Sequence, residues 1–329
     1  MDKKIDFVLL WVDGTDKNWL MEKKKYKADI DISDSIIRYR DWDNLKYWFR
    51  SVEKYAPWVN KIYFVTCGQK PSWLNENNPK LVFVDHKDYI PKEYLPTFSS
   101  HVIELHMHKI KGLSEQFVYF NDDTFITDFV KPEDFFRNGK PMDSAIESAV
   151  STYDKSLYNI YYNMLAIINA KFNKKAIIKN SKWFNIKYGK NVLRNLLCYP
   201  WKNFIGFYNF HCPHAYLKQT FKEVWEQNSE VLMETSRHKF RSSSDVNQYL
   251  MRYWQLCTNN FEPRKFNFSK AITLTNDDRY ACECIEKRKY KLLCINDSSL
   301  ISDKDFKVFK EDIISSFEAT LPDKSSFEK

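Results

Sequence analysis

The first 120 residues alternate short apolar runs with stretches of helical spacing, and this alternation limits the folds open to the chain more than any other feature. The nearly continuous apolar runs cover residues 5–12, 61–66, 81–84 and 116–120. Such runs are typical of strands buried on both faces of a parallel sheet. Because parallel strands need right-handed helical crossovers, the sequence predicts an α/β fold with a doubly wound, mostly parallel sheet.

Helices are expected between these strands and again after them. Residues 43–56 and 96–108 have helical spacing, and Asp43 and Pro57 are suitable start and stop signals for the first helix. Later helices are expected over 215–227, 244–257 and 303–317, with one more strand over 291–295.

The composition is that of one ordered globular unit. With 329 residues, 17% aromatic side chains and six glycines, the chain is long enough for a single large α/β domain with an insertion. The first apolar run is short and ends at Asp13, so we expect neither a signal peptide nor a membrane-spanning helix but a soluble chain. Its seven cysteines favour reduced thiols of a cytoplasmic protein over a disulfide framework.

Two adjacent carboxylates follow the strand expected at 116–120, in the triplet Asn121-Asp122-Asp123. Adjacent carboxylates repel each other unless a cation neutralises them, and a divalent ion bridging to a diphosphate would do so. Ligands of doubly wound sheets bind beyond the carboxyl ends of strands. The triplet is therefore a candidate metal-linked phosphate site, and the alternative is a turn that closes the strand.

Two other asparagine–aspartate sequences bear on that interpretation. Asn296 and Asp297 follow the strand expected at 291–295 and could complete an oxygen shell around a hard metal. A second triplet, residues 276–278, also reads Asn-Asp-Asp and follows an apolar run. The tripeptide alone therefore does not identify a site.

Histidines and an arginine supply further candidates. His101, Glu104 and His108 have the spacing of one helical face, which would be a ligand or proton-relay face, or a polar face with one functional carboxylate. His211 stands just before a proline, a rigid place for a proton-exchanging imidazole, although packing at a helix start is the alternative. Arg241 precedes a serine-rich helix start that suits phosphate oxygens, with a solvated charge as the alternative.

The net charge of +8 is concentrated in residues 155–202, which hold ten Lys and Arg and no Asp or Glu. Tyr, Trp, Ile and Leu interleave with these cations, so we expect a basic helical insert. Its surface could rest peripherally on an anionic membrane or hold a polyanionic acceptor. The alternative is a cap over the site with solvated lysines.

Taken in order, these fragments resemble the signature regions of the Stealth family. The first region is similar to Trp11-Val12-Asp13-Gly14-Thr15-Asp16, and the second covers 38–125, including RYRDWDNLKYWFRSVEKYAPWVN and VYFNDDTF. The third is similar to the HCPH sequence at 211–214 and to Arg241 with Asp245, and the fourth to the CIND sequence at 294–297. Residues 155–202 lie outside the resemblance.

The Stealth family includes bacterial capsule and exopolysaccharide phosphotransferases and the animal N-acetylglucosamine-1-phosphotransferase. The resemblance implies transfer of a hexose-1-phosphate from a nucleotide sugar, commonly UDP-linked, to a sugar hydroxyl, with release of UMP. Together with the cysteines and the basic insert, this predicts a cytoplasmic enzyme with peripheral contact to the inner face of the membrane through residues 155–202. We expect a saccharide or lipid-linked glycan as its acceptor and no binding of nucleic acid. Residues 1–329 would form one catalytic domain: a nucleotide-sugar-binding core (1–140), the basic insert (150–205), and the rest of the site with a closing helix (206–329).

Specific residues follow from the matching positions. The resemblance implies the catalytic residues Glu104, Asp123, His211 and Arg241. It implies Mg²⁺ or Mn²⁺ on Asp122, Asp123, Asn296 and Asp297, and donor binding by Trp11, Asp13, Gly14, Asp16, Arg40 and Asp41. We expect Arg241 to balance phosphoryl charge, His211 to act as general base and Glu104 to orient a histidine or the acceptor, while Asp123 as the base stays open.

Two other functions remain open at this point. A conventional metal-dependent glycosyltransferase would share the fold and the acidic site but attack carbon and release UDP. A non-enzymatic module that binds a polyanion or a membrane would use the basic insert, and it would not need Glu104, His211 and Arg241 together.

Overall fold

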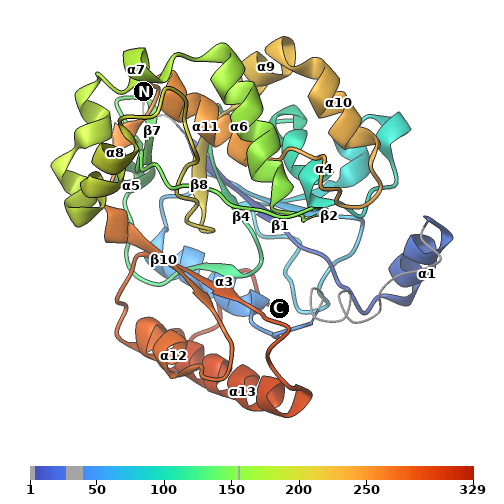
Figure 1. Cartoon of the computed structure of the whole chain (residues 1–329). Helices are drawn as coiled ribbons and strands as arrows, with labels where there is room; N and C mark the ends of the chain where they lie inside the picture. The colour runs from blue at the N-terminus through green and yellow to red at the C-terminus, as the bar shows by residue number, and fades with distance from the viewer. Residues whose placement is uncertain (1–3, 27–39, 155) are drawn as a thin grey trace.

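The computed structural model describes residues 4–26, 40–154 and 156–329, and a five-stranded sheet lies at its centre (Figure 1). The strands are β1 (Ile5–Leu10), β2 (Ile62–Thr66), β3 (Leu81–Asp85), β4 (Gln116–Phe120), β5 (Thr124–Ile126), β6 (Phe136–Arg137), β7 (Lys140–Asp143), β8 (His214–Leu217), β9 (Glu262–Pro263), β10 (Ser269–Thr273) and β11 (Leu292–Asn296). The central order is β3-β2-β1-β4-β8, with β1 to β4 parallel and β8 antiparallel to β4. The α/β fold with a mostly parallel sheet is therefore confirmed.

Helices cover both faces of this sheet. The described helices are α1 (Lys17–Tyr26), α3 (Leu45–Tyr55), α4 (Ser100–Leu105), α5 (Pro132–Phe135), α6 (Asn159–Lys171), α7 (Lys174–Ile177), α8 (Val192–Cys198), α9 (Lys218–Gln227), α10 (Ser229–Arg237), α11 (Tyr249–Cys257), α12 (Arg279–Glu286) and α13 (Asp303–Thr320). Figure 1 shows α4, α6, α9, α10 and α11 on one side of the sheet, and α3, α12 and α13 on the other. None of the described helices combines the length and apolarity that crossing a membrane requires.

The strand residues explain this double covering. In β1, Phe7 and Leu9 pack into the core formed with α3, α12 and α13, whereas Val8 and Leu10 pack into the core formed with α4, α6 and α9 to α11. Side chains alternate across a strand, so an all-apolar strand must be covered on both faces. The burial of all six β1 residues agrees with this.

A second, three-stranded sheet positions the loops at the end of β4. Its order is β10-β11-β5, with β10 parallel and β5 antiparallel to β11. Because β5 begins four residues after β4 ends, this sheet holds the intervening loop next to β11. A third sheet has the order β6-β7-β9, and its strands lie between β5 and β10 in the sequence.

Three expected helix boundaries were wrong. Helix α4 begins at Ser100 instead of 96, because Phe98 is extended and donates its N–H to the carbonyl of Lys239 at 2.8 Å. Residues 215–217 belong to strand β8, because they pair with β4. Helix α11 begins at Tyr249 instead of 244, because Asp245 is engaged in the preceding loop.

The insert folds as α6, α7 and α8 with short 3₁₀ turns between the last two helices. Trp183 is fully buried within it. The buried Lys174 ammonium lies 2.8 Å from Glu147 Oε2 and donates to the carbonyl of Cys198 at 2.6 Å. Removing one partner of such a buried pair is costly, so this contact fixes the insert to the core.

Candidate active site

Three chain segments meet where β4 ends. Strand β4 delivers the triplet 121–123, and the N–H of Ile295 in β11 donates to the carbonyl of Asp123 at 2.9 Å. Strand β8 is antiparallel to β4, so the residues that precede β8 arrive at the same edge. This topology brings His211 beside the triplet although 87 residues separate the two in sequence.

The Asp123 carboxylate lies at the centre of the cluster. Its Oδ2 is 3.4 Å from the Sγ of Cys294 and 3.7 Å from Nε2 of His211. Its Oδ1 is buried and has no hydrogen-bond partner among the described residues. The Cys294 thiol also lies 3.5 Å from Oδ1 of Asn296. A buried carboxylate oxygen is costly without a partner, and a cation, a substrate group or a water can satisfy it.

These atoms fit a divalent cation. One ligand atom each from Asp123, His211 and Cys294 lies within 4.8 Å of the others. Burial raises the pKa of the Cys294 thiol well above its usual value, which disfavours the thiolate form that binds metals. The carboxylate of Asp123 and the amide oxygen of Asn296 are instead the ligands that Mg²⁺ and Mn²⁺ prefer.

His211 is held beside Asp123 by an unusual backbone conformation. Its φ of 48° is in the left-handed region, which non-glycine residues seldom adopt outside turns and functional sites. The imidazole remains 47% exposed. The Asp123 carboxylate raises the pKa of His211 above its usual value. The side chain thus faces solvent on one side and a carboxylate on the other.

A buried hydroxyl connects Glu104 to the triplet. The Tyr119 hydroxyl lies 3.1 Å from Oε1 of Glu104 and in still closer contact with Oδ1 of Asn121. The second carboxylate oxygen of Glu104 accepts from the N–H of Gln248 at 3.5 Å. Helix α4 therefore presents Glu104, 5% exposed, behind the loop that carries Asp123.

The loop 238–245 carries Arg241 across α4. Asp245 is fully buried and accepts hydrogen bonds from the rings of His101 and His238, each at 2.7 Å. The guanidinium of Arg241 donates to the Ser100 hydroxyl at 2.7 Å. After Asp123, the charge of Glu104 raises the pKa of His211 and that of Arg241 lowers it. The other three predicted catalytic residues therefore all act electrostatically on the His211 imidazole.

The turn of the first signature region, residues 13–16, follows β1, the strand next to β4. The N–H of Asp13 donates to Oε1 of Gln69 at 2.8 Å, and the Gln69 amide donates back to the Asp13 carbonyl at 3.0 Å. Trp11 stacks on Phe64 at 5.6 Å between ring centroids. Gly14 lies in the turn itself, which leads to the helix α1.

A pocket of about 530 Å³ opens beside this turn, at the carboxyl ends of β2 and β3. Asp16 lines it and also accepts from the N–H of Trp19 at 2.7 Å. Cys67, Asp85 and Phe98 form other parts of its wall. Three residues predicted to bind the donor do not line this pocket, although they precede Asp16 by only a few positions: Trp11, Asp13 and Gly14.

The predicted site residues that remain to be placed are Arg40, Asp41, Asp122 and Asp297. Arg40 Nη1 lies 3.6 Å from Oδ1 of Asp297, and one carboxylate oxygen of Asp297 has no hydrogen-bond partner among the described residues. Desolvation and then the charge of Asp123 raise the pKa of Asp122 to about 7, and Asp41 contributes in the same direction. Asp297 thus faces a guanidinium, whereas Asp122 lies in a negative environment that a cation would relieve.

The predicted single histidine face was wrong. His101 bonds to Asp245, Glu104 to Tyr119, and His108 stacks on Phe221 with the ring centroids 5.6 Å apart. The helix ends at Leu105 and a 3₁₀ turn follows, so His108 leaves the face of the other two. These side chains therefore do not form one ligand set.

The sequence interpretation missed three contributors: Cys294, Tyr119 and Gln69. Cys294 was placed among the reduced thiols and in the CIND sequence of the fourth region but was given no role, yet in the structure it lies between Asp123 and Asn296. Its position two residues before Asn296 was the available signal. Tyr119 carried none, because an aromatic in a buried strand is ordinary core.

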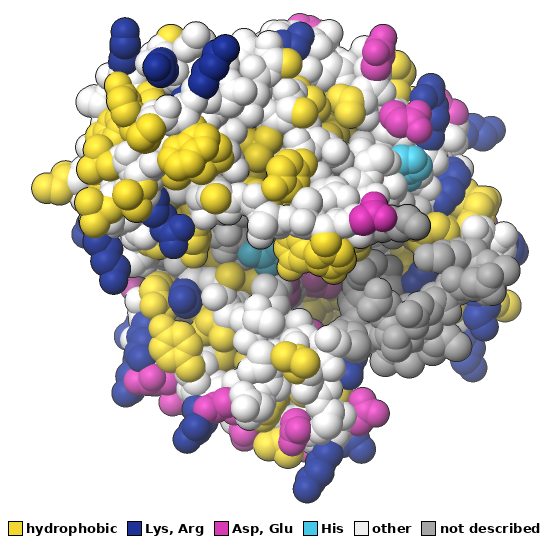
Figure 2. Space-filling view, in the orientation of Figure 1, with side chains coloured by type: hydrophobic (Ala, Val, Ile, Leu, Met, Phe, Trp, Pro, Cys, Tyr) yellow, Lys and Arg dark blue, Asp and Glu magenta, His cyan; other side chains and the backbone are white. Residues whose placement is uncertain are grey.

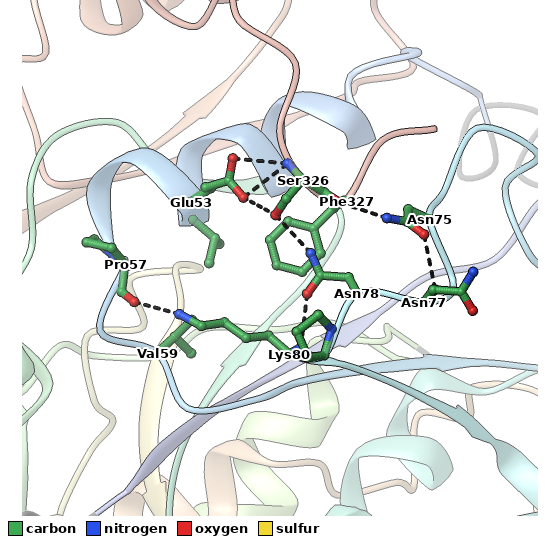
Figure 3. A pocket seen from close by; sticks show the side chains of 12 residues that line it. Glu53, Pro57, Val59, Asn75, Asn77, Asn78, Lys80, Ser326 and Phe327 are labelled. Atoms are coloured by element: carbon green, nitrogen blue, oxygen red, sulfur yellow. Dashed lines mark hydrogen bonds between the residues drawn. The ribbon is translucent and has the colours of Figure 1, made fainter.

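A second pocket, of about 370 Å³, lies away from this cluster (Figure 3). It is at the amino-terminal ends of β2 and β3. Figure 3 shows Phe327 at its centre, with Glu53 and Asn78 both bonded to Ser326. The chain's own carboxyl-terminal residues satisfy these polar groups, so this pocket is where the tail docks.

Comparison with known proteins agrees with the resemblance. Models of Stealth protein conserved regions 1, 2 and 3 match residues 3–31, 38–143 and 210–254. The capsular polysaccharide phosphotransferase WcwK of Streptococcus pneumoniae is 47% identical, over 99% of this chain and 98% of its own. The exopolysaccharide phosphotransferase cps2G of Lactiplantibacillus plantarum is 39% identical, over 99% of this chain and 96% of its own. The structure of the galactosyltransferase LgtC aligns with a TM-score of 0.41 at 10% identity, over 98% of both chains.

The matched regions contain the cluster that the topology assembles. Region 2 contains Glu104 and Asp123, and region 3 contains His211 and Arg241. With near full-length identity to two polysaccharide phosphotransferases, the chain belongs to the Stealth family of bacterial phosphotransferases.

Proposed function

We propose that the protein transfers a hexose-1-phosphate from a UDP-sugar to a sugar hydroxyl, for capsule or cell-surface polysaccharide synthesis. The acceptor is a saccharide or a lipid-linked glycan, and nucleotide sugars place the reaction in the cytoplasm. The observation that carries this proposal is the convergence of Asp123, His211, Glu104 and Arg241 from matched regions of a family whose relatives are named polysaccharide phosphotransferases.

The bond changes are those of an in-line displacement at phosphorus. The acceptor oxygen bonds to the phosphorus that carries the sugar, and the bond from that phosphorus to the bridging oxygen breaks. UMP leaves with the electron pair of that bond. The acceptor hydroxyl loses its proton, and His211 is placed to take it because its ring is half exposed and adjoins Asp123.

The other residues stabilise charge and position. Arg241 is a fixed cation for the non-bridging oxygens, since its guanidinium is anchored to Ser100. Glu104, held by Tyr119, orients the acceptor or the imidazole. Asp123 and Asn296, with Asp122, would hold a divalent cation, which would neutralise the diphosphate. The pocket beside Asp16 would take the nucleoside.

One assay distinguishes this reaction from conventional glycosyl transfer. The purified protein is incubated with a panel of UDP-sugars and acceptor glycans in Mg²⁺, in Mn²⁺ or in EDTA, and the nucleotides are separated by ion-exchange chromatography. We expect UMP with a phosphodiester signal in the ³¹P spectrum, and loss of both in EDTA. Release of UDP with a glycosidic product would instead identify a glycosyltransferase.

A further inference from the structure

The outer face of the insert carries apolar side chains that no other described residue covers. Helix α8 has leucines at positions 193, 196 and 197, which lie on one helical face, and they are 60%, 52% and 73% exposed. Ile186 and Trp201 are 91% and 54% exposed beside them in sequence. We name these five residues the outer insert face. A helix of a soluble domain normally turns its apolar stripe toward the core, and α8 does the reverse.

Buried polar contacts hold α8 in this orientation. The side-chain oxygen of Asn195 accepts from the N–H of Glu147 at 2.7 Å. Its amide donates to the carbonyls of Ala145 at 2.7 Å and Trp183 at 2.6 Å. Asn195 is 2% exposed, and rolling the helix inward would break all three bonds in a buried environment. The leucines therefore stay outside.

Cations surround this apolar face, and acids are absent from its sequence. Residues 156–202 contain no Asp or Glu. Two of their cations, Lys174 and Lys182, pair with Glu147 and Glu262. The others are exposed and form no salt bridge with described residues: Lys171, Lys175, Lys179, Lys187, Lys190, Arg194 and Lys202. Figure 2 shows apolar side chains gathered where Figure 1 places α7 and α8, with Lys and Arg around them.

We propose that the outer insert face docks peripherally on an anionic lipid bilayer. Leucine and tryptophan side chains enter the boundary between headgroups and acyl chains, and surrounding lysines are attracted to anionic headgroups. Trp201 suits this boundary because its ring is apolar and its N–H is polar. Docking of two copies face to face is disfavoured, because it would bring two sets of cations together without an anion between them.

The insert also links this face to the catalytic cluster. Asn163 in α6 donates to the carbonyls of Ser243 and Asp245, in the loop that carries Arg241, both at 2.9 Å. Helix α6 has 13 residues, which span about 20 Å. Docking of the insert would therefore also orient the loop that carries Arg241 relative to the membrane, where a lipid-linked acceptor would be held. The docking itself depends only on the surface and stands apart from the proposed reaction.

The test measures binding of the whole protein to vesicles by flotation. Vesicles of phosphatidylcholine with 30% phosphatidylglycerol are compared with phosphatidylcholine alone, at low and high salt. We expect binding to the anionic vesicles that weakens at high salt. The double substitution Leu196→Ser and Leu197→Ser should weaken it about tenfold or more, because it removes apolar area that enters the bilayer.

A matched control separates this face from apolar exposure in general. Leu300 and Val308 are 73% and 48% exposed, close to the values for Leu197 and Leu196, and they lie outside the insert. Leu300→Ser with Val308→Ser should leave vesicle binding unchanged. Unfolding temperatures of both double variants should match that of the parent, since all four side chains are exposed.

Three results would overturn the proposal. They are no binding of the parent protein to anionic vesicles, equal binding by the two double variants, and a parent dimer in light scattering that the α8 variant dissociates. UMP release with a water-soluble acceptor reports on the reaction separately. The α8 variant should retain it, so failure of docking and failure of the proposed chemistry give different results.

Discussion

The two Asn-Asp-Asp triplets have the same sequence and both follow a strand, yet their surroundings differ. Asp123 is 28% exposed, one of its oxygens has no described partner, and its neighbours His211 and Cys294 come from distant segments. Asp277 bonds to Arg279, two residues along, at 2.5 Å. Arg279 lowers the pKa of Asp277 to about 2, whereas desolvation raises that of Asp122 to about 7.

This contrast shows that the tripeptide does not determine the chemistry. The second triplet satisfies its own charge locally, as a solvated turn at the start of α12 does. The first depends on strands β8 and β11, which bring His211 and Cys294 beside Asp123, while burial raises the pKa of Asp122. The site that we propose for a cation and a diphosphate is therefore at the first triplet. Each triplet is associated with one arginine and one supporting hydroxyl, which allows matched pairs of substitutions. The arginines are Arg241 and Arg279, and the hydroxyls are those of Tyr119 and Thr275.

The largest expected effect is at the two central aspartates. Asp123→Asn should lower UMP release by roughly 10³-fold or more, because it removes the proposed metal ligand and the partner of His211. Asp277→Asn should leave turnover within about twofold, since its carboxylate interacts only with an exposed arginine. Steady-state rates of the two purified variants check this. Equal rates would mean that the first triplet is merely a turn.

His211→Ala should cost roughly 10² to 10³-fold in kcat with little change in the donor KM, as expected when a general base is lost. The split between kcat and KM is the measurement. A loss confined to KM would assign His211 to donor binding and would leave Asp123 as the base.

The arginines come next. Arg241→Gln should reduce kcat/KM by about 10²-fold if, as we propose, its guanidinium balances phosphoryl charge. Arg279→Gln should have no effect on turnover, because the side chain is 88% exposed and contacts only the second triplet. If Arg241→Lys restored most of the activity, a point charge would suffice and the anchoring to Ser100 would be unimportant.

The supporting hydroxyls should have smaller effects. Tyr119→Phe removes the link between Glu104 and Asn121, and we expect a loss of about tenfold in kcat. At the second triplet, Thr275 donates to Asn276 at 3.1 Å on the surface, and Thr275→Val should be neutral. Undiminished turnover of Tyr119→Phe would show that Glu104 acts without this connection.

The apolar pattern could predict the first triplet's place at a strand end, whereas its grouping with His211 came only from the family resemblance, and its contact with Cys294 came from neither. Strands β1 to β4 follow from apolar runs, because a buried parallel strand has few polar residues. The antiparallel strand β8 was taken for the start of a helix, because its four residues precede a true helical pattern. The contact of Asp123 with Cys294 depends on β5 pairing with β11, a long-range pairing that no local pattern records.

The smallest expected effect is on the stability of the fold, and it concerns two buried histidines. His106 and His108 follow α4 and are 0% and 9% exposed. Burial lowers their pKa values to about 3 and about 4. The unfolded chain takes up protons below about pH 6.5, and the folded chain does not. Their contribution to stability is therefore complete above pH 6.5 and is lost as the pH falls toward 4.

Between pH 7.5 and 5.5 these two histidines should lower the free energy of unfolding by roughly 2 to 3 kcal/mol, a fall of several degrees in Tm. His108→Phe keeps a ring stacked on Phe221 and removes one titrating group, so its Tm should change less with pH, with turnover at pH 7.5 unaffected. Scanning calorimetry at several pH values measures this. If Tm changed with pH in His108→Phe as much as in the parent, His108 would not titrate on unfolding. Another group would then cause the loss of stability in acid.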